Sequence, residues 1–182
     1  MMRIVFFIAA LIISSASAAS PAGVIPYACI EDGPYVLLAF DPNTKRLGYG
    51  AFGGRKENDE SIAETAAREF YEETRCAFDR PTAVDLAATS PSERDGYYAF
   101  VAEINFISPL AIVESPCDAR LERSDWLWVR YGDLIRALQT DEKRPRVFAS
   151  LALKYIDLWE GAASSMRAAM GDGVLPIDGL CK

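Results

Sequence analysis

The sequence has no histidine among its 182 residues, and this absence excludes several classes of enzyme. Hydrolases built on Ser-His-Asp or Cys-His arrangements need an imidazole to take and return a proton, so both are excluded. The cysteines form no CxxC pair, and without histidine no zinc site is expected. There are four of them: Cys29, Cys76, Cys117 and Cys181.

Basic residues are in the minority. The chain has 19 Lys and Arg side chains against 26 Asp and Glu, which gives a formal net charge of −7 at pH 7. An acidic surface repels phosphate backbones and anionic lipid head groups. We therefore expect no nonspecific binding to nucleic acid or to anionic membranes.

Long apolar runs are scarce, and the clearest one covers residues 4–13. A helix that spans a bilayer needs about 20 apolar residues, so this run is too short. Arg3 precedes it and the small residues Ala16, Ser17 and Ala18 follow it, so residues 1–19 resemble a secretory signal peptide. We expect an exported protein, periplasmic or secreted, without stable membrane association after cleavage; an uncleaved N-terminal anchor is the alternative. In an oxidising compartment the four cysteines can form disulfides, in any of three pairings.

The most informative residues that are present lie at positions 54–76, which read GRKENDESIAETAAREFYEETRC. If this segment is helical, Glu69, Glu72 and Glu73 project from one face, because their spacing is i, i+3 and i+4. Three like charges on one patch repel, and a divalent cation would compensate them. Hard cations such as Mg²⁺ prefer carboxylate oxygens and bridge proteins to substrate phosphates. The alternative is a solvated acidic helix.

The spacing of this segment resembles the signature of the Nudix hydrolase family. That signature is glycine, five residues, glutamate, seven residues, arginine-glutamate, an apolar residue, any residue, glutamate-glutamate, any residue, glycine and an apolar residue. The positions in register are Gly54, Glu60, Arg68, Glu69, Phe70, Glu72, Glu73 and Cys76.

One position departs from the signature, because Arg75 stands where the family has glycine. That glycine closes the helix in a left-handed conformation, which costs another residue type roughly 1 kcal/mol or somewhat more. We expect the chain to tolerate this cost, since Arg75 is not at a ligand position, with a small displacement of Glu73.

The resemblance implies a mixed β-sheet sandwiched between helices, an α/β (α+β) fold. It also implies metal-dependent hydrolysis of a nucleoside diphosphate linked to another moiety, with Mg²⁺ or Mn²⁺ as cofactor and a small nucleotide as partner. Glu72 and Glu73 would bind the metal, and Glu69 would bind it or orient the water. Arg68 would hold Glu69 by a salt bridge. The resemblance further places the Gly53 carbonyl among the metal ligands and Glu60 in a supporting role.

Many members of the family use a further carboxylate from outside the signature. The sequence offers several candidates without ranking them, and each can equally be an ordinary surface acid. They are Glu93 and Glu122, with Glu114 and Asp125.

The substrate is indicated only by residues 90–93, Ser-Pro-Ser-Glu. This segment is similar to the proline-containing segment of ADP-ribose pyrophosphatases, and it favours ADP-ribose or a nucleotide sugar. A loop proline also simply shapes a turn. The alternative function is a catalytically weak nucleotide-binding or protein-interaction module on the same fold.

Periodicity predicts one domain over residues 20–163, with a tail at 164–182 that is loosely ordered unless Cys181 holds it. The signature helix should begin at Ser61, which has capping-box spacing with Glu64. Further helices are predicted at 132–138 and 145–163. Strands are predicted at 24–30, 35–41, 47–52, 82–88, 96–104 and 126–131.

Overall fold

The structure is a computed structural model, and it describes residues 20–115, 117, 122–176 and 180–181. The predicted signal peptide, residues 1–19, lies outside the described residues. Within them, no helix has the length and apolar character required to cross a membrane.

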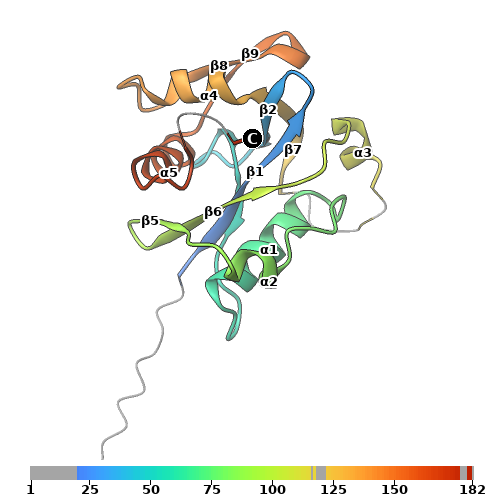
Figure 1. Cartoon of the computed structure of the whole chain (residues 1–182), viewed down its shortest axis with the longest axis vertical. Coiled ribbons are helices and arrows are strands. Elements are labelled where there is room, and N and C mark those ends of the chain that lie inside the picture. The colour runs from blue at the N-terminus through green and yellow to red at the C-terminus, as the bar shows by residue number, and fades with distance from the viewer. Residues whose placement is uncertain (1–19, 116, 118–121, 177–179, 182) are drawn as a thin grey trace, which may run out of the picture.

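A mixed sheet of seven strands forms the centre of the fold (Figure 1). Its main order is β3-β2-β1-β6-β5, with β4 paired to β1 and β7 paired to β2. The β1–β6 pair is parallel and the other pairs are antiparallel. The strands are β1 (Ala22–Ile30), β2 (Gly33–Asp41), β3 (Gly48–Gly50), β4 (Phe52–Gly54), β5 (Ser92–Arg94), β6 (Tyr97–Glu103) and β7 (Ser124–Arg130).

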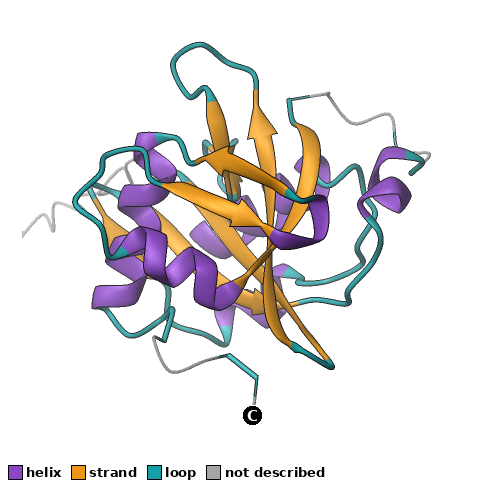
Figure 2. Cartoon of the chain, turned by 90° about the horizontal axis from the view of Figure 1, so that it is seen from above, coloured by secondary structure: helices purple, strands orange, loops and turns teal. Residues whose placement is uncertain are grey.

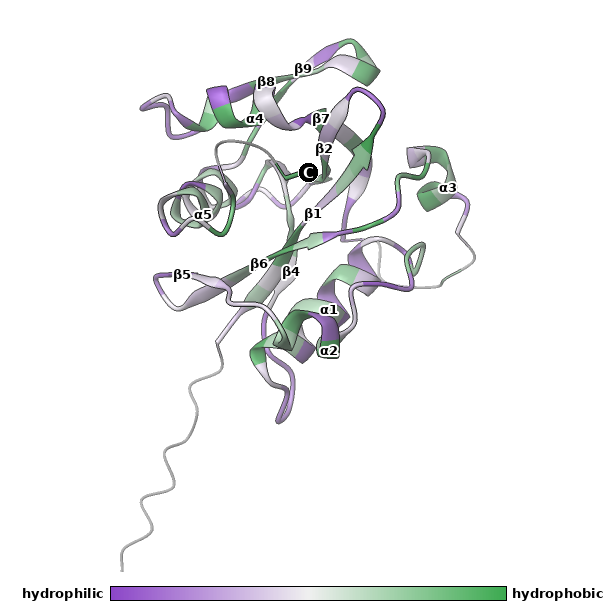
Figure 3. Ribbon diagram, in the orientation of Figure 1, coloured by the Kyte–Doolittle hydropathy of each residue, from purple (hydrophilic) through white to green (hydrophobic). Residues whose placement is uncertain are grey.

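Helices cover both faces of this sheet, as the two perpendicular views show (Figures 1 and 2). One apolar cluster joins β-strand residues to α1 (Ile62–Glu73) and α2 (Ala83–Ala87). The other joins the opposite face to α4 (Tyr131–Leu138) and α5 (Glu160–Gly171). Hydrophobic residues are concentrated along β1 and β6, between the two helical layers (Figure 3). The predicted fold, a mixed sheet sandwiched between helices, is confirmed.

Helix α1 forms where the sequence predicts it. Ser61 is its N-cap and accepts a hydrogen bond from the Glu64 backbone N–H, while the Glu64 carboxylate accepts one from the Ser61 N–H. This capping box satisfies two backbone donors that a helix start leaves free. Ala66 and Phe70 are fully buried against the sheet, and Glu69 and Glu73 are buried beside them, whereas Glu64 and Glu72 are exposed.

Several predicted elements match the structure closely. The strands predicted at 24–30, 35–41, 96–104 and 126–131 correspond to β1, β2, β6 and β7, and the helix at 132–138 corresponds to α4. The strand predicted at 47–52 is divided in two, since β3 pairs with β2 whereas β4 pairs with β1.

The strand predicted at 82–88 is wrong. Residues Ala83–Ala87 form the short helix α2, and a second capping box explains why. The Thr82 side chain accepts from the Asp85 N–H, and the Asp85 carboxylate accepts from the Thr82 N–H. These side-chain bonds favour a helical turn over the extended chain.

The long helix predicted at 145–163 is also wrong. The segment forms β8 (Arg146–Ala149), the 3-10 turn η1 (Ser150–Ala152) and β9 (Lys154–Asp157), and β8 and β9 make a separate hairpin. Burial along β8 alternates, with Val147 and Ala149 inside, which is the period of a strand. A short helix, α3 (Pro109–Val113), lies at the edge of the molecule away from α5 (Figure 1).

The predicted tail begins inside helix α5, and the condition stated for its order, a bond from Cys181, is met. Helix α5 continues to Gly171 and buries Met166 and Ala169 against the sheet. A disulfide joins Cys181 to Cys29 at the end of β1. The other disulfide joins Cys76 to Cys117, so the structure selects one of the three pairings.

Candidate functional site

Glu69 lies at the middle of the acidic face of α1 and is 9 % exposed. It packs against the end of β4, where a Cβ on Gly54 would lie 2.3 to 2.5 Å from the Glu69 carboxyl atoms. Position 54 therefore requires glycine, because the Glu69 carboxyl group lies where a Cβ would be. Burial raises the pKa of Glu69 to about 7; Arg68 opposes this rise and Glu73 adds to it.

Arg68 forms ion pairs with three acids of the signature: Glu60, Glu69 and Glu72. Its Nε donates to Glu60 Oε1 at 2.7 Å, and its Nη1 lies 3.1 Å from both Glu69 Oε1 and Glu72 Oε2. Its Nη2 also donates to the Arg55 carbonyl at 2.8 Å. The hydrogen bond from Arg68 lowers the pKa of Glu60. The geometry gives Arg68 a positioning role, whereas Glu64 caps the helix.

Glu73 is buried and is held by groups from two other elements. Arg123 Nε donates to its Oε1 at 2.7 Å, and the Gly53 N–H donates to its Oε2 at 2.8 Å. The Trp126 indole N–H donates to the Glu73 backbone carbonyl at 3.0 Å. Burial raises the pKa of the Glu73 carboxyl, while Arg123 opposes the rise.

A further buried acid, Asp41 at the end of β2, lies behind this pair. Arg46 Nε approaches Asp41 Oδ2 at 2.8 Å and Arg123 Nη1 approaches it at 3.4 Å. Arg123 therefore contacts two buried carboxylates at once. Burial alone would lower the pKa of Arg123, but these carboxylates, Glu73 above all, raise it.

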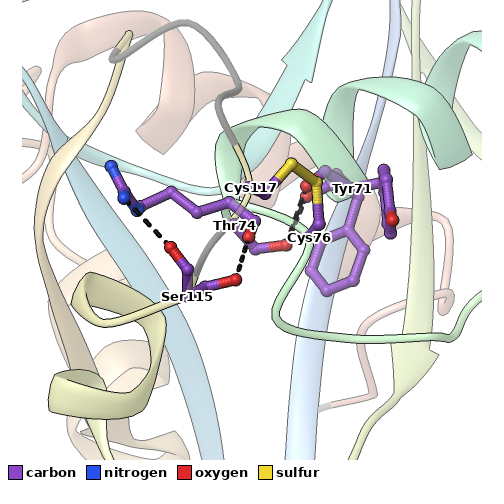
Figure 4. Close-up of a disulfide and its surroundings, with 7 residues drawn as sticks. Tyr71, Thr74, Cys76, Ser115 and Cys117 are labelled. Carbon is purple, nitrogen blue, oxygen red and sulfur yellow. Dashed lines mark hydrogen bonds between the residues drawn. A yellow bond between two sulfur atoms is a disulfide. The ribbon is translucent and has the colours of Figure 1, made fainter.

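The C-terminal end of α1 is tied to the segment that precedes β7 (Figure 4). Arg75 has φ +55°, so it takes the left-handed conformation of the family's glycine. Its Nη2 donates to the Ser115 carbonyl at 3.1 Å, and the Ser115 hydroxyl donates to the Arg75 carbonyl. The neighbouring Cys76 is bonded to Cys117. These ties hold the helix end to the stretch of chain that continues to Arg123.

A cavity of about 370 Å³ opens beside the glycines that end β4. Gly53 and Gly54 line it on one side and Trp159, at the start of α5, lines it on another. Its charged lining residues are four arginines and one acid, which are Arg46, Arg55, Arg94, Arg123 and Asp95. In a chain of net charge −7 this cavity is a local concentration of cationic groups, and such a site attracts anions.

Tyr97, the first residue of β6, also lines the cavity. A Cβ on Gly23 or Gly53 would lie 2.1 or 2.2 Å from the Tyr97 hydroxyl oxygen, so the two glycines leave room for it. Burial raises the pKa of Tyr97, with Glu73 as the next contribution.

The residues present fit a divalent cation of the kind the family implies, but not every acid of the signature has free oxygens to offer it. Among the described residues, no three acidic or cysteine side chains converge as a ready-made metal cage. Mg²⁺ does not require one, because it is commonly bound by one or two carboxylates together with waters and substrate phosphates. Glu69 and the exposed Glu72 offer such oxygens on one helix face. Glu73 has both oxygens engaged, by Arg123 and Gly53.

The candidates for an additional carboxylate lie in different surroundings. Glu93, in β5, accepts the Gly96 N–H at 2.7 Å, and Asp125 is engaged by the Tyr49 hydroxyl and by Lys154. Glu122 is exposed, and its charge adds to the rise that burial causes in the pKa of the Glu73 carboxyl. Glu114 caps α3. Of the four, Glu122 lies in the chain next to Arg123, the residue that holds Glu73.

Sequence reasoning missed two residues of the site, Arg123 and Asp41. Arg123 and Asp41 have no signature around them, and their roles follow from the folding of β2 and β7 beside α1. A sequence cue existed for Asp41, since a charged residue that ends a strongly apolar strand is often paired when buried.

Comparison with known proteins places the chain in a family. The sequence profile described as the NUDIX domain matches residues 21–151, well over half of the chain. The chain therefore belongs to the Nudix domain family.

Individual relatives are distant. A structure of a MutT/nudix family protein from Enterococcus faecalis is 17 % identical, with a TM-score of 0.50, and the match covers 86 % of this chain and 62 % of that one. A C. elegans Ap4A hydrolase complex is 16 % identical, with a TM-score of 0.46, over 64 % of this chain and 83 % of that one. The uncharacterized protein L534 of Acanthamoeba polyphaga mimivirus is 46 % identical over 61 residues, which is 31 % of this chain and 20 % of that protein. The match thus spans about a fifth of that relative, and the structural likenesses concern the fold alone.

Proposed function

We propose that the chain hydrolyses, with a divalent metal ion, the diphosphate of a nucleoside diphosphate linked to another moiety, with ADP-ribose or a nucleotide sugar favoured. The observation that carries the proposal is the cationic cavity, which opens at Gly53 and Gly54 beside the acidic face of α1. Arginines complement phosphate oxygens, whereas the acids offer oxygen ligands to a hard cation. The Nudix family as a whole uses divalent metals.

Each part of the site has a distinct task in this proposal. A bound Mg²⁺ or Mn²⁺ neutralises phosphate oxygens and lowers the pKa of bound water. Glu69 and Glu72 hold the cation, or Glu69 orients the attacking water. Arg68 fixes both carboxylates through its three ion pairs. Arg123 fixes Glu73 and presents its remaining surface to the cavity.

The preference for ADP-ribose or a nucleotide sugar is supported by the placement of residues 90–93. Ser92 begins β5, and its hydroxyl donates to Asp172 after α5 at 2.6 Å. The same short strand carries Arg94 into the cavity lining. The proline-containing segment therefore leads directly to the proposed substrate site.

We propose further that the protein acts outside the cytosol, on extracellular or host-derived nucleotide conjugates. The signal-peptide pattern of residues 1–19 supports this, and so do two disulfides among the described residues, since disulfides persist in oxidising compartments. A C-terminally tagged chain should be recovered, shortened, from the periplasm or the medium. Recovery of the full-length protein from the cytosol alone would remove this part of the proposal.

Turnover decides between a hydrolase and a binding module. We would incubate the chain from Ala19 onward with Mg²⁺ or Mn²⁺ and ADP-ribose, nucleotide sugars, dinucleoside polyphosphates, NADH and nucleoside triphosphates. Release of a nucleoside monophosphate should depend on the metal.

Two variants make this test specific. Glu72→Gln should abolish turnover without unfolding the protein, because the Glu72 side chain is 48 % exposed. Glu103→Gln, an exposed acid at the end of β6, is the matched control and should retain activity. Metal-dependent nucleotide binding without any product would instead favour a binding module.

A further inference from the structure

The Tyr97 hydroxyl lies in a space left by two paired glycines, Gly23 and Gly53. Gly23 in β1 and Gly53 in β4 are partners in the antiparallel register, so they lie side by side. A Cβ on either would come within 2.2 Å of the hydroxyl oxygen; at Gly23 it would also meet the Phe52 carbonyl. Any residue with a Cβ at position 23 or 53 would overlap the Tyr97 hydroxyl, so only glycine fits at both. The place where β1, β4 and β6 meet is thus shaped around this one oxygen.

This hydroxyl has no protein partner in the described part of the chain, since none of the hydrogen bonds found there uses it. The residue lines the cavity, and a ligand there can supply the acceptor.

The charges around the hydroxyl indicate which acceptor fits. Tyr97 lies close enough to Glu73, Glu69, Arg123 and Arg46 to experience their fields. Both arginines line the same cavity, whereas both glutamates belong to α1 and do not line it. A neutral phenol supplies a donor without adding charge, and phosphate oxygens are acceptors that the two arginines also attract.

We propose that Tyr97 donates a hydrogen bond from the cavity floor to a phosphate oxygen of the bound diphosphate, next to Gly53. The proposal rests on the proposed function, in that it takes the ligand to carry a diphosphate. It assigns a substrate contact to a residue outside the Nudix signature.

Tyr97→Phe tests this directly, because it removes one oxygen and keeps the ring. Tyr98→Phe is the matched control: the next residue of β6 packs into the apolar cluster on the other face of the sheet. Binding would be measured by calorimetry with and without Mg²⁺ for inorganic pyrophosphate, ADP-ribose and adenosine. Hydrolysis and thermal unfolding would be followed in parallel.

A hydrogen bond to a charged phosphate predicts that Tyr97→Phe binds pyrophosphate and ADP-ribose roughly 10- to 100-fold more weakly. Adenosine binding and the melting temperature should stay as in the wild type, and Tyr98→Phe should change neither phosphate ligand. Unchanged pyrophosphate affinity in Tyr97→Phe would overturn the proposal, as would an equal loss for adenosine.

The outcomes also separate this proposal from the proposed function. Wild-type protein that binds pyrophosphate in a Tyr97-dependent way but hydrolyses no nucleotide would contradict the function and keep the contact. Hydrolysis that is equally fast in Tyr97→Phe would contradict the contact and keep the function. A wild type that binds neither pyrophosphate nor ADP-ribose would overturn both.

Discussion

Two arginines hold the acids of α1, and they do so in opposite surroundings. Arg68 and its partners Glu60 and Glu72 lie at the surface, with side chains 20 %, 20 % and 48 % exposed. Arg123 and its partner Glu73 are 3 % and 4 % exposed. The same type of ion pair therefore occurs once in contact with solvent and once in the interior.

The difference teaches which arginine serves stability and which serves geometry. Exposed pairs contribute little to folding, whereas removal of one partner from a buried pair leaves a charge without compensation. We expect Arg123 to be needed mainly for the folded state and Arg68 mainly for the placement of Glu69 and Glu72.

The largest expected effect is that of Arg123→Ala. It leaves Glu73 and Asp41 buried without their shared partner, which should lower the free energy of unfolding by about 3–5 kcal/mol. Urea denaturation measures this loss. Arg130→Ala, at an exposed arginine on β7 whose side chain is 50 % exposed, is the control and should cost about 1 kcal/mol or less. A loss below 1 kcal/mol for Arg123→Ala would remove the contrast between the two clusters.

An intermediate effect concerns Glu69, which lies between the two arginine clusters. Its pKa is raised in the folded protein to about 7, so its contribution to stability is complete below pH 4.5 and is lost as the pH rises towards 7. Without divalent cations, the free energy of unfolding should therefore decrease across this window by an amount on the order of 2 kcal/mol relative to Glu69→Gln.

The difference between the two proteins is the quantity to measure, by urea titration in a chelator at several pH values. Other carboxyls with lowered pKa, such as Glu60 and Asp125, act in the opposite direction and cancel in this comparison. Parallel pH curves for wild type and Glu69→Gln would contradict the raised pKa.

The smallest effect on stability is expected for Arg68→Ala, at about 1 kcal/mol, because two of its three partners, Glu60 and Glu72, remain in contact with water. The effect on catalysis should be larger, since the freed carboxylates lose their orientation, and we expect kcat/KM to fall roughly 10- to 100-fold. Initial rates and urea titration on the same preparation measure both. If stability fell as far as in Arg123→Ala, the two arginines would not differ in role.

The Arg68 cluster could be predicted from the sequence because its members lie within one helix and its preceding loop. The ion pair to Glu69 follows from the signature, and the pair to Glu72 from the i,i+4 spacing. The Arg123 cluster joins β2, α1 and the start of β7, 32 to 82 residues apart in the chain, and no local pattern marks such a contact.

The same limit explains the error at residues 145–163. Val147, Leu151 and Leu158 satisfy helical spacing, yet the structure leaves Leu151 56 % exposed and buries Val147 and Ile156 from facing strands of a hairpin. The hydrophobic period alone could not decide between a helix and a hairpin, because the decisive contacts of β8 are made with α4 and β7. Strands β1 and β2 were predictable because clear turn residues bound their apolar runs.

The disulfide between Cys29 and Cys181 has a topological consequence. It joins residues that are 152 positions apart, so nearly the whole described domain forms a covalent ring. A single cut by a protease in any loop between these cysteines opens the ring but leaves one molecule of unchanged mass apart from an added water. Such a nick would be invisible on a denaturing gel without reductant, and the two fragments would separate once a reductant had broken both disulfides.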